Sequence, residues 1–574
     1  MGLAVDGFII LFYFVVITAI GLYMGRREKS LADFALGGRQ VPWWAVMASI
    51  IAAETSAATF LGAPGEGYDK RSIVYVQLVV GLIIGRFIVG NAFLKPYYLY
   101  KVYTVYDYLG IRFGPRTKSF VSALFLIMRT LASGTRLFVP SLVMVLAWRL
   151  FTGGSVKFSQ QAVTSVWPYL VAIIGLTIIT CIYTALGGIK AVIWTDVVQA
   201  CLMFGGALIA AGTLIYHIGG LGSIAQYAPK MMHLNGYFVF GFESATVSEW
   251  MTVHKLTEMG WWDYVKLILG SEYTVFSALI GTTLANMAAF GTDQDMVQRM
   301  LTAETYKKAR RSLLTAAFMD LPIAATFTFI GVLLYIYYQK DPTFKPAANA
   351  DVFGSYILNV MPAGIRGMVL AGIFATAMGS FSAALNALAT SAVNDWYIRM
   401  KPGRDDEHYV RAAKWSTVIF ATLMVMVAGG FAYAKVTDPS ARIIPVVLGI
   451  AGYILGPMLG VFLIGMFTRN RGSDKGNLIA ITAGLITTAL LGGLAFNIVN
   501  FFWTTTGHTA LTKPDWMGLV SFTWFAMIGS VVVFSIGVLF KTPEETLIRA
   551  KQRAEEAQAG DDKPMDLRVS GTAA

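Results

Sequence analysis

Residues 43–65 read WWAVMASIIAAETSAATFLGAPG, an apolar stretch long enough to cross a membrane but interrupted twice. The first interruption is Ala52-Ala53-Glu54-Thr55-Ser56, and the second is Gly62-Ala63-Pro64-Gly65. Glycine and proline weaken a helix interior, and an acid is costly inside hydrocarbon. Unwound backbone at membrane depth is tolerated where it lines a cavity or is buried in protein. The stretch therefore predicts a broken membrane helix beside a binding site, with a seam of small residues between helices as the alternative.

The rest of the chain has the composition of a membrane protein. Of its 574 residues, 56% are hydrophobic and 14% are charged, and the mean hydropathy is +0.61. A water-soluble protein of this length needs more charge on its surface. The net charge of +12 lies largely in short loops, so it indicates membrane topology rather than nucleic-acid binding. We expect an all-α polytopic protein whose surroundings are the lipid bilayer.

Apolar runs of about 20 residues, the length that spans the hydrocarbon, recur along the chain and predict about thirteen transmembrane helices. Two of them, 119–149 and 353–397, are too long for one upright helix and predict tilt or a helical extension. The approximate spans are 5–24, 43–65, 72–98, 119–149, 167–187, 192–216, 265–290, 309–338, 353–397, 411–434, 443–467, 477–496 and 516–540.

Lysine and arginine are concentrated in every second loop, beginning with Arg26 and Arg27 after the first span. Because cationic loops stay on the cytoplasmic side, this alternation predicts a multi-pass cell-membrane protein with its N-terminus outside and its C-terminus in the cytoplasm. The charged segment from about Lys541 predicts a cytoplasmic amphipathic helix followed by a disordered tail.

Two blocks of five predicted helices, 43–217 and 265–467, each open with an interrupted helix. The interruption in the second block follows Asn286 and reads Gly291-Thr292-Asp293-Gln294. Broken helices at matching positions indicate an inverted-repeat transporter with a binding site near the midplane. The predicted organisation is a leading helix and inside loop (1–42), a first repeat (43–217), an outside loop (218–264), a second repeat (265–467), two trailing helices (468–540) and a tail (541–574).

Residues 376–382 read Thr-Ala-Met-Gly-Ser-Phe-Ser, and Thr376, Gly379 and Ser380 share one helix face. If this helix crosses the first broken helix near its interruption, hydroxyl and carbonyl oxygens from the two helices complete a shell for a hard monovalent cation such as sodium. Packing of small residues explains the same letters.

Charged residues inside predicted spans are the other candidates, because each costs at least ~2.5 kcal/mol at the bilayer centre. They are Glu54, Arg129, Arg136 and Asp320. Two interpretations stay open for Glu54: a buried ion pair with an arginine, or direct contact with a ligand. Asp196 is predicted in the first turn of the span that begins near residue 192, with Thr195 as a possible N-cap.

Several segments, in order, resemble the sodium:solute symporter family over roughly residues 5–500. The resemblance implies the leucine-transporter-type fold of five plus five inverted helices, with one helix before this core and two after it. The matching segments are Gly37-Gly38-Arg39, Pro42-Trp43-Trp44, the stretch 187–199 containing Trp194-Thr195-Asp196, Thr292-Asp293-Gln294, Val297-Gln298-Arg299, Leu385-Asn386 and Asp395-Trp396-Tyr397.

The resemblance places the family's main sodium site on the carbonyl groups of Ala52, Thr55 and Thr376 and on side chains at 379 and 380. Ser380 fits this pattern. Gly379 departs from it, because the family usually carries Ser or Thr there, so one ligand hydroxyl is missing. The departure leaves weaker sodium binding, a water ligand, another ion, or compensation by Glu54 as explanations.

A second cation site, present in some members, maps onto Asp196 and Ser382, but residue 383 is Ala rather than Ser. Phe290 is a candidate gate, with plain packing as its alternative. The resemblance places substrate positions on Thr59, Asn286 and Asp320, with Gln77 nearby, and Arg136 lies near a carboxylate-binding arginine of the sialic acid transporter. Glu54, which matches an acidic residue important for the cation in the proline transporter, and Arg129 are substrate candidates as charges inside predicted spans.

Together these features predict a secondary active transporter that couples a small polar solute, charged or zwitterionic, to sodium by alternating access. The alternatives are a proton-coupled or ion-independent carrier of the same fold and a transporter-like solute sensor. No metal motif, nucleophile–base pair or phosphate loop is recognisable, so an enzyme is not expected. The expected ligands are sodium and a small molecule, and the sequence leaves the oligomeric state open.

Overall fold

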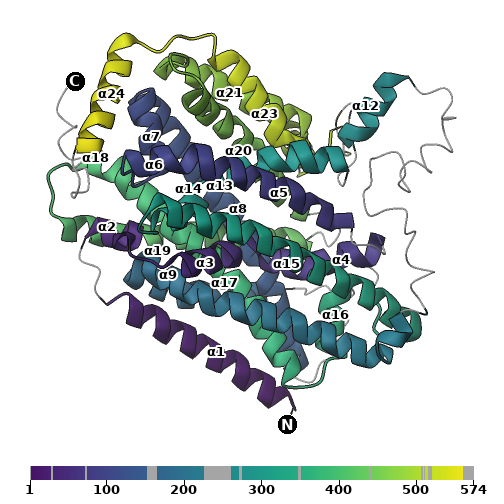
Figure 1. The fold of residues 1–574 in the computed structure, drawn as a ribbon. Coiled ribbons are helices and arrows are strands. Elements are labelled where there is room, and N and C mark those ends of the chain that lie inside the picture. Colours follow the sequence, from purple (N-terminus) through teal and green to yellow (C-terminus); the bar gives the residue numbers. More distant parts are fainter. Residues whose placement is uncertain are drawn as a thin grey trace. The chain divides into compact units, whose positions relative to one another are not determined.

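The computed structural model describes residues 2–26, 30–70, 74–151, 165–224, 226, 260–270, 274–346, 351–437, 443–505, 509, 511–512, 514, 517 and 520–559. Within these ranges the regular elements are helices, and the only β pairing is two isolated bridges, such as the one between Val41 and Ala303. The predicted all-α class is confirmed (Figure 1).

Seven helical stretches in the described part of the chain are long and apolar enough to cross a membrane, and a bent pair, Trp43–Glu54 with Thr59–Asp69, makes eight. The predicted total of thirteen stays a prediction, because several expected spans consist of shorter helices. The seven stretches are Gly2–Met24, Tyr75–Leu99, Pro115–Arg149, Trp167–Ile218, Tyr306–Lys340, Ile365–Met400 and Asp406–Ala434.

The chain divides into two compact units, and each gathers three separate segments. Unit 1 contains Met1–Val76, Arg129–Tyr237 and Gln298–Val447. Unit 2 contains Gln77–Met128, Phe238–Val297 and Leu448–Ala574. These units are defined by contacts and do not test the predicted repeats, whose boundaries stay a prediction.

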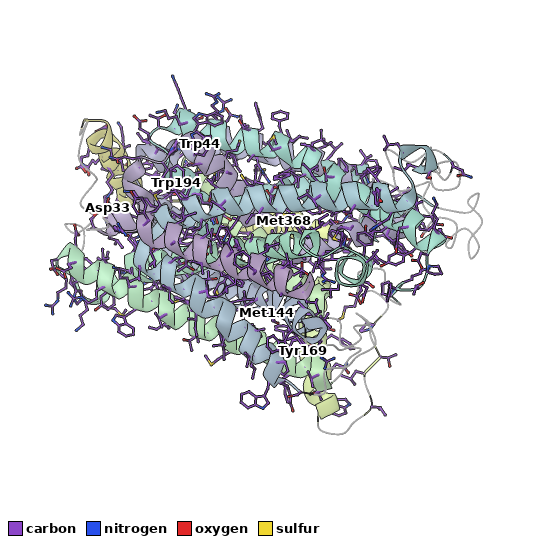
Figure 2. The ribbon with its side chains drawn as sticks, turned by 90° about the horizontal axis from the view of Figure 1, so that it is seen from below. Asp33, Trp44, Met144, Tyr169, Trp194 and Met368 are labelled. Carbon is purple, nitrogen blue, oxygen red and sulfur yellow. The ribbon has the colours of Figure 1, made fainter. Side chains whose placement is uncertain are left out.

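In unit 1, α1 (Gly2–Met24) packs along α9 (Trp167–Ile218) and α17 (Ile365–Ser391), as Figure 1 shows. The first half of the broken helix, α3 (Trp43–Glu54), packs on the same two helices. Trp44 meets Trp194 of α9 edge to face, with ring centroids 5.5 Å apart (Figure 2). Such aromatic pairs add to the packing energy, so this one fixes the start of α3 on α9.

The second half of the broken helix, α4 (Ala57–Lys70), crosses α15 (Tyr306–Lys340) in backbone contact. A β-carbon on Gly67 would lie 2.1 Å from the Thr328 carbonyl oxygen, and one on Gly331 would lie 2.0 Å from the Pro64 carbonyl oxygen. Only glycine permits this approach, which is the small-residue packing typical of membrane helices.

The two spans expected at 167–187 and 192–216 form α9, whose 52 residues bend at Gly188. Gly188 has φ 49° and ψ −153°, a conformation that glycine adopts without the clash a β-carbon causes. Thr195 lies inside α9, beyond this bend, so the prediction that Thr195 is an N-cap is wrong. Its hydroxyl donates to the Val192 carbonyl within the helix, 2.9 Å away.

The long span expected at 353–397 consists of a separate α16 (Val352–Asn359), α17, a π-helical turn at Ala392–Tyr397 and a short α18 (Ile398–Met400). Asp6 of α1 fixes the start of α17. One carboxylate oxygen accepts from the amides of Gly364 and Gly367 at 2.6 and 2.9 Å, and the other pairs with Arg366 at 2.7 Å. The expected added extension is therefore a distinct helix with its own turn.

In unit 2, α5 (Leu78–Ile88) packs closely on α13 (Thr283–Gly291) and on a π-helical turn at Ser277–Thr282. The interruption predicted in the second block is confirmed: α13 ends at Gly291, and α14 (Gln294–Leu301) begins after Asp293. The predicted amphipathic helix after Lys541 is α24 (Glu544–Ala559), and the predicted tail beyond it lies outside the described residues.

The remaining helices, taken from both units, are α2 (Leu31–Leu36), α6 (Leu94–Leu99), α7 (Val105–Arg112), α8 (Pro115–Phe151), α12 (Trp261–Gly270), α19 (Asp406–Thr437), α20 (Ile443–Phe467), α21 (Asp474–Leu491), α22 (Leu494–Thr505) and α23 (Phe525–Gly537).

Candidate cation and solute site

Of the two interruptions predicted in residues 43–65, the one at Glu54-Thr55-Ser56 is present between α3 and α4. The prediction at Gly62-Ala63-Pro64-Gly65 is wrong, because α4 continues through these residues with Pro64 inside the helix. Thr55 leaves the helix with φ −78° and ψ 107°, and the two halves meet at a bend of 64°. Ser56 caps the start of α4: its hydroxyl oxygen accepts a hydrogen bond from the Thr59 amide at 3.2 Å, as an N-cap serine does. The local sequence Glu54-Thr55-Ser56 thus ends one helix and begins the next.

Helix α17 presents Ser380 to this interruption. The Ser380 hydroxyl donates to the Ala53 carbonyl at 3.2 Å and lies 3.5 Å from the Thr55 carbonyl oxygen. Thr376 lies one turn earlier in α17, and its hydroxyl donates a hydrogen bond to the Gly372 carbonyl of the same helix at 2.6 Å. The structure therefore brings the predicted ligands Thr55 and Ser380 together, with the Ser380 hydroxyl beside the Thr55 carbonyl oxygen. Their role as sodium ligands stays a prediction.

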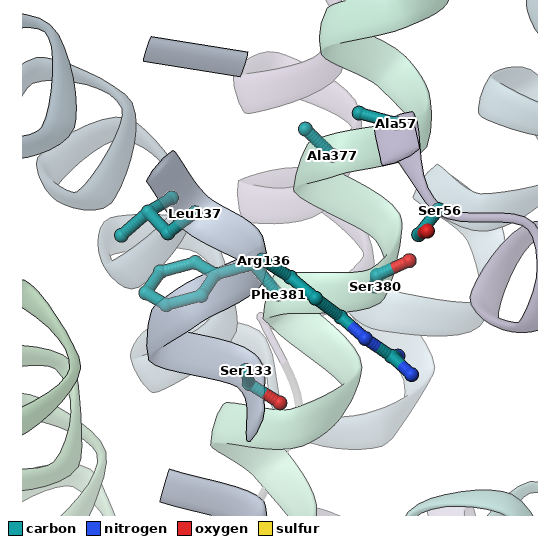
Figure 3. Close-up of a pocket in the computed structure, with 8 residues that line it drawn as sticks. All are labelled: Ser56, Ala57, Ser133, Arg136, Leu137, Ala377, Ser380 and Phe381. Carbon is teal, nitrogen blue, oxygen red and sulfur yellow. The ribbon is translucent and has the colours of Figure 1, made fainter. Parts of the chain in front are cut away.

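A small pocket adjoins this meeting point (Figure 3). It lies between the start of α4, the second half of α8 and α17. In Figure 3 the Arg136 side chain reaches from α8 past the face of α17 that carries Ser380. A guanidinium here offers an anionic group a charge-assisted hydrogen bond beside the candidate cation position. The lining residues are Ser56, Ala57, Ser133, Arg136, Leu137, Ala377, Ser380 and Phe381.

Asp196, predicted for a second cation site, is fully buried beside the first half of the broken helix. Its Oδ2 accepts from the Ser49 hydroxyl at 2.5 Å and lies 3.4 Å from Arg299 Nη2, and Ser49 Oγ also accepts from Arg299 Nε at 2.9 Å. Sequence reasoning noted Arg299 only within a motif and missed this pairing. The available signal was Asp196, the one charged residue of the predicted span 192–216, which needs a cationic partner inside the membrane.

Ser382, the other residue of the predicted second site, is also fully buried. Its hydroxyl donates to the Gly379 carbonyl at 3.1 Å. On the side where a β-carbon would stand, Gly379 faces Asp196: such an atom would lie 3.3 Å from Asp196 Oδ1. Both predicted members of the second site therefore gather around Gly379.

The other candidates in unit 1 lie on the broken helix, on α15 and on α8. Glu54 ends α3 and is half-buried, and Thr59 lies in the first turn of α4, also half-buried. Asp320 is buried within α15, which packs on both α3 and α4, and Arg129 is buried within α8. Each of these charged groups interacts with other protein groups. Their contact with a solute stays a prediction.

Three candidates belong to unit 2. Gln77 is buried just before α5, and Asn286 of α13 uses its amide to donate to the Thr282 carbonyl at 3.1 Å. Phe290, the candidate gate, is buried with its ring under Arg86, whose guanidinium carbon lies 4.0 Å from the ring centroid. Arg86, fully buried in α5, was missed, although a lone arginine in the run 72–98 was the available signal.

Comparison with known proteins gives a family and a fold. Residues 34–484 match the model of the sodium:solute symporter family. The chain is 28% identical over 500 residues to a sodium/sialic acid symporter of Proteus mirabilis, covering 86% of this chain and 90% of that one. It is 25% identical over 507 residues to a sodium/glucose cotransporter of Vibrio parahaemolyticus, covering 84% of each.

Two solved structures have the same fold. One is the substrate-bound, outward-open state of a Na⁺-coupled sialic acid symporter, with a TM-score of 0.71, 25% identity and coverage of 93% of this chain and 97% of that one. The other is a transporter of the nucleobase-cation-symport-1 family, with a TM-score of 0.51, 13% identity and coverage of 92% and 99%. The predicted leucine-transporter-type fold is confirmed.

Proposed function

Since this chain belongs to the sodium:solute symporter family, we propose that it carries sodium and a small polar organic solute across the membrane together, by alternating access. The observation that carries the proposal is the Ser380 hydroxyl, which α17 holds against the carbonyl groups of Ala53 and Thr55 at the interruption between α3 and α4. Neutral hydroxyl and carbonyl oxygens in a water-poor interior are suited to a hard monovalent cation.

A cation at this position has a direct route to coupling. The carbonyl oxygens come from the end of α3, where it meets α4 at a bend, and the hydroxyl oxygen comes from α17. A cation that draws these oxygens together stabilises one arrangement of the three helices more than another. Coupling requires such a difference in binding free energy between states. Sodium therefore favours the arrangement in which the solute pocket beside Ser380 is formed.

The solute is proposed to carry a carboxylate or another anionic group. Arg136 lines the same pocket as Ser56 and Ser380. An arginine binds a carboxylate with two parallel hydrogen bonds, and the pocket places this pair next to the cation. Of the relatives reported above, one is named for sialic acid and the other for glucose, a neutral sugar, so Arg136 rather than the relatives carries this choice. A zwitterion also fits, with Glu54 or Asp320 as the acidic partner.

We further propose that the N-terminus lies outside and that α24 lies on the cytoplasmic side, because the cationic loops alternate along the chain. The protein is a multi-pass membrane protein. A single cysteine placed in α24 is expected to resist a membrane-impermeant maleimide in intact cells and to react after permeabilisation. Labelling in intact cells would reverse the proposed orientation.

The first test is thermal unfolding of the purified protein in choline chloride against rising sodium chloride at constant ionic strength. A ligand that binds the folded protein raises its apparent stability by mass action. We expect a saturable rise in the unfolding temperature with sodium but not with potassium. The rise is expected to be lost in Ser380→Ala. Ser141→Ala is the control, because Ser141 is buried in α8 and donates to the Phe138 carbonyl of its own helix.

Absence of a sodium-specific rise in the wild type at several pH values would contradict sodium coupling and favour the proton-coupled carrier, with Glu54 as the titrating group. Once sodium binding is established, sialic acid, lactate and glucose are compared for additional stabilisation and for uptake into proteoliposomes. Uptake that requires an inward sodium gradient supports the symporter. Solute binding without any uptake would instead support a sensor.

A further inference from the structure

Gly379 lies where oxygens from two other helix segments converge. A β-carbon on this glycine would lie 2.7 Å from Gln199 Oε1, 3.3 Å from Asp196 Oδ1 and 3.6 Å from the Ala52 carbonyl oxygen. The first two atoms belong to α9 and the third to the end of α3. The space that a side chain at 379 would occupy is therefore bordered by an amide, a carboxylate and a backbone carbonyl oxygen. These are oxygen types that bind hard cations.

The side-chain oxygen of Gln199, Oε1, has no hydrogen-bond partner among the described residues. The residue is also almost fully buried, with 1% of its surface exposed. A buried acceptor without a partner costs free energy that a folded protein rarely leaves uncompensated. The other end of the same amide is engaged, because Nε2 donates to the Tyr13 hydroxyl oxygen at 3.3 Å. The Tyr13 hydroxyl in turn donates to the Met378 sulfur at 3.6 Å, so its oxygen is the acceptor. This chain of contacts turns Oε1 toward Gly379.

The charge around Gly379 suits a monovalent cation. Asp196 is the acid of this group, and its Oδ2 is engaged by Ser49 and Arg299 while Oδ1 faces Gly379. Arg299 offsets much of the carboxylate charge, so the oxygens near Gly379 form a weakly negative group. A divalent cation prefers several carboxylates, whereas a single positive charge is satisfied by neutral oxygens and one shared carboxylate.

We propose that the carboxamide oxygen of Gln199 is a sodium ligand and takes the place of the hydroxyl that Gly379 cannot provide. The proposal rests on sodium coupling as the function and deepens it, because it assigns a ligand on α9 that the sequence comparison did not. It also explains how the site tolerates glycine at 379, without a direct role for Glu54. Gln199 thereby joins α9 to the cation contacts of α3 and α17.

Gln199 and a side chain at 379 compete for one space. A serine at 379 would bring its β-carbon within 2.7 Å of Oε1, the far end of a flexible side chain that moves at little cost. The new hydroxyl would then provide the oxygen that the displaced amide no longer does. Gly379→Ser is therefore expected to be tolerated and to make Gln199 dispensable.

The test is the apparent sodium Kd, obtained from the sodium dependence of thermal unfolding, for four variants of the full chain. Gln199→Leu, which keeps the bulk and removes the oxygen, is expected to raise the Kd about tenfold. Gly379→Ser is expected to stay within about threefold of wild type, and Gln199→Leu/Gly379→Ser is expected to regain most of the lost affinity. Gln199→Glu offers acceptor oxygens, so it is expected to retain sodium binding.

Thr195→Val is the matched control, because Thr195 lies in the same part of α9 and its hydroxyl donates a hydrogen bond to the Val192 carbonyl of its own helix. Its sodium Kd is expected to match wild type. If the amide instead acts as a donor to Asp196, Gln199→Glu will fail like Gln199→Leu, and Gly379→Ser will not rescue either; that result overturns the proposal. A Gln199→Leu Kd within twofold of wild type overturns the ligand assignment alone. A wild type without a sodium response overturns the proposed function as well.

Discussion

The hydroxyl oxygen of Ser49 lies 2.5 Å from Asp196 Oδ2, which joins the first half of the broken helix to the second half of α9. Arg299 completes the contact from the other side, with Nε 2.9 Å from the same hydroxyl. All three residues are buried, with Ser49 and Asp196 fully inaccessible. The contact holds the middle of α3 against α9 and so helps to position the carbonyl groups at the end of α3.

Arg299→Ala is expected to destabilise the protein strongly, because it leaves the Asp196 carboxylate buried without its cationic partner. Loss of one partner of a buried ion pair costs about 3–5 kcal/mol. The measurement is the unfolding temperature in detergent. Asp196→Asn/Arg299→Met should recover part of the loss, because no charge remains buried. Arg411→Ala is the control: its pair with Glu407 is exposed, so the change is expected to be within about 0.5 kcal/mol.

Gly67→Ala is expected to destabilise unit 1 by about 1–3 kcal/mol, because the added methyl group would lie 2.1 Å from the Thr328 carbonyl and force α4 away from α15. The displaced α4 should also lower sodium-dependent stabilisation. Gly62→Ala, in the same helix, meets nothing within 4 Å and should be neutral or slightly stabilising. Equal effects of the two substitutions would show that helix propensity, rather than the crossing, governs this region.

Gly188→Ala is expected to destabilise the folded protein by about 1–3 kcal/mol, because φ 49° with ψ −153° is strained for a residue with a β-carbon. The measurement is the unfolding temperature, which should fall. The strain should also shift the second half of α9, which carries Asp196 and Gln199. Gly205→Ala, later in α9 with open space at its β-carbon position, serves as the reference. An unfolding temperature for Gly188→Ala equal to that of the reference would rule out a strained bend.

Asp6→Ala is expected to cost about 3 kcal/mol, because it removes both the partner of Arg366 and the acceptor for the first amides of α17. Asp6→Asn keeps an acceptor oxygen for the Gly364 and Gly367 amides, so its cost should be nearer 1 kcal/mol. Thermal unfolding of the two variants separates the roles. Equal losses would assign the whole effect to the ion pair.

Arg136→Gln is expected to abolish stabilisation by a carboxylate solute while sodium still raises the unfolding temperature. Arg136→Lys should restore only part of the response, because an ammonium cannot form the paired hydrogen bonds of a guanidinium. Ser133→Ala, another residue of the same pocket, tests whether any change to the lining has this effect. An unchanged response to sialic acid in Arg136→Gln would remove Arg136 from the solute site.

The sequence predicted the membrane class, most helix positions and the interruptions after Glu54 and Gly291, because these depend on local properties. The interruption predicted at Gly62–Gly65 was wrong, because packing of α4 against α15 keeps that segment helical. Apolar length determines what can span a bilayer, and the residues Glu54-Thr55-Ser56 and Gly291-Thr292-Asp293 have low helix propensity, which favours a break. The sequence also predicted that Thr55 and Ser380 meet, through the pattern of a family that fixes how these helices cross.

The tertiary structure alone decided which polar groups share a space. Thr195 was predicted as a cap from neighbouring letters, yet α9 continues through Gly188, and Thr195 bonds within it. Ser49, Asp196 and Arg299 are separated by 147 and 103 residues along the chain, so no local pattern predicts their contact. The substitution at 379 looked like a lost ligand in sequence. In the fold, Gln199 reaches that space, because helix packing rather than sequence distance sets which oxygens surround a missing side chain.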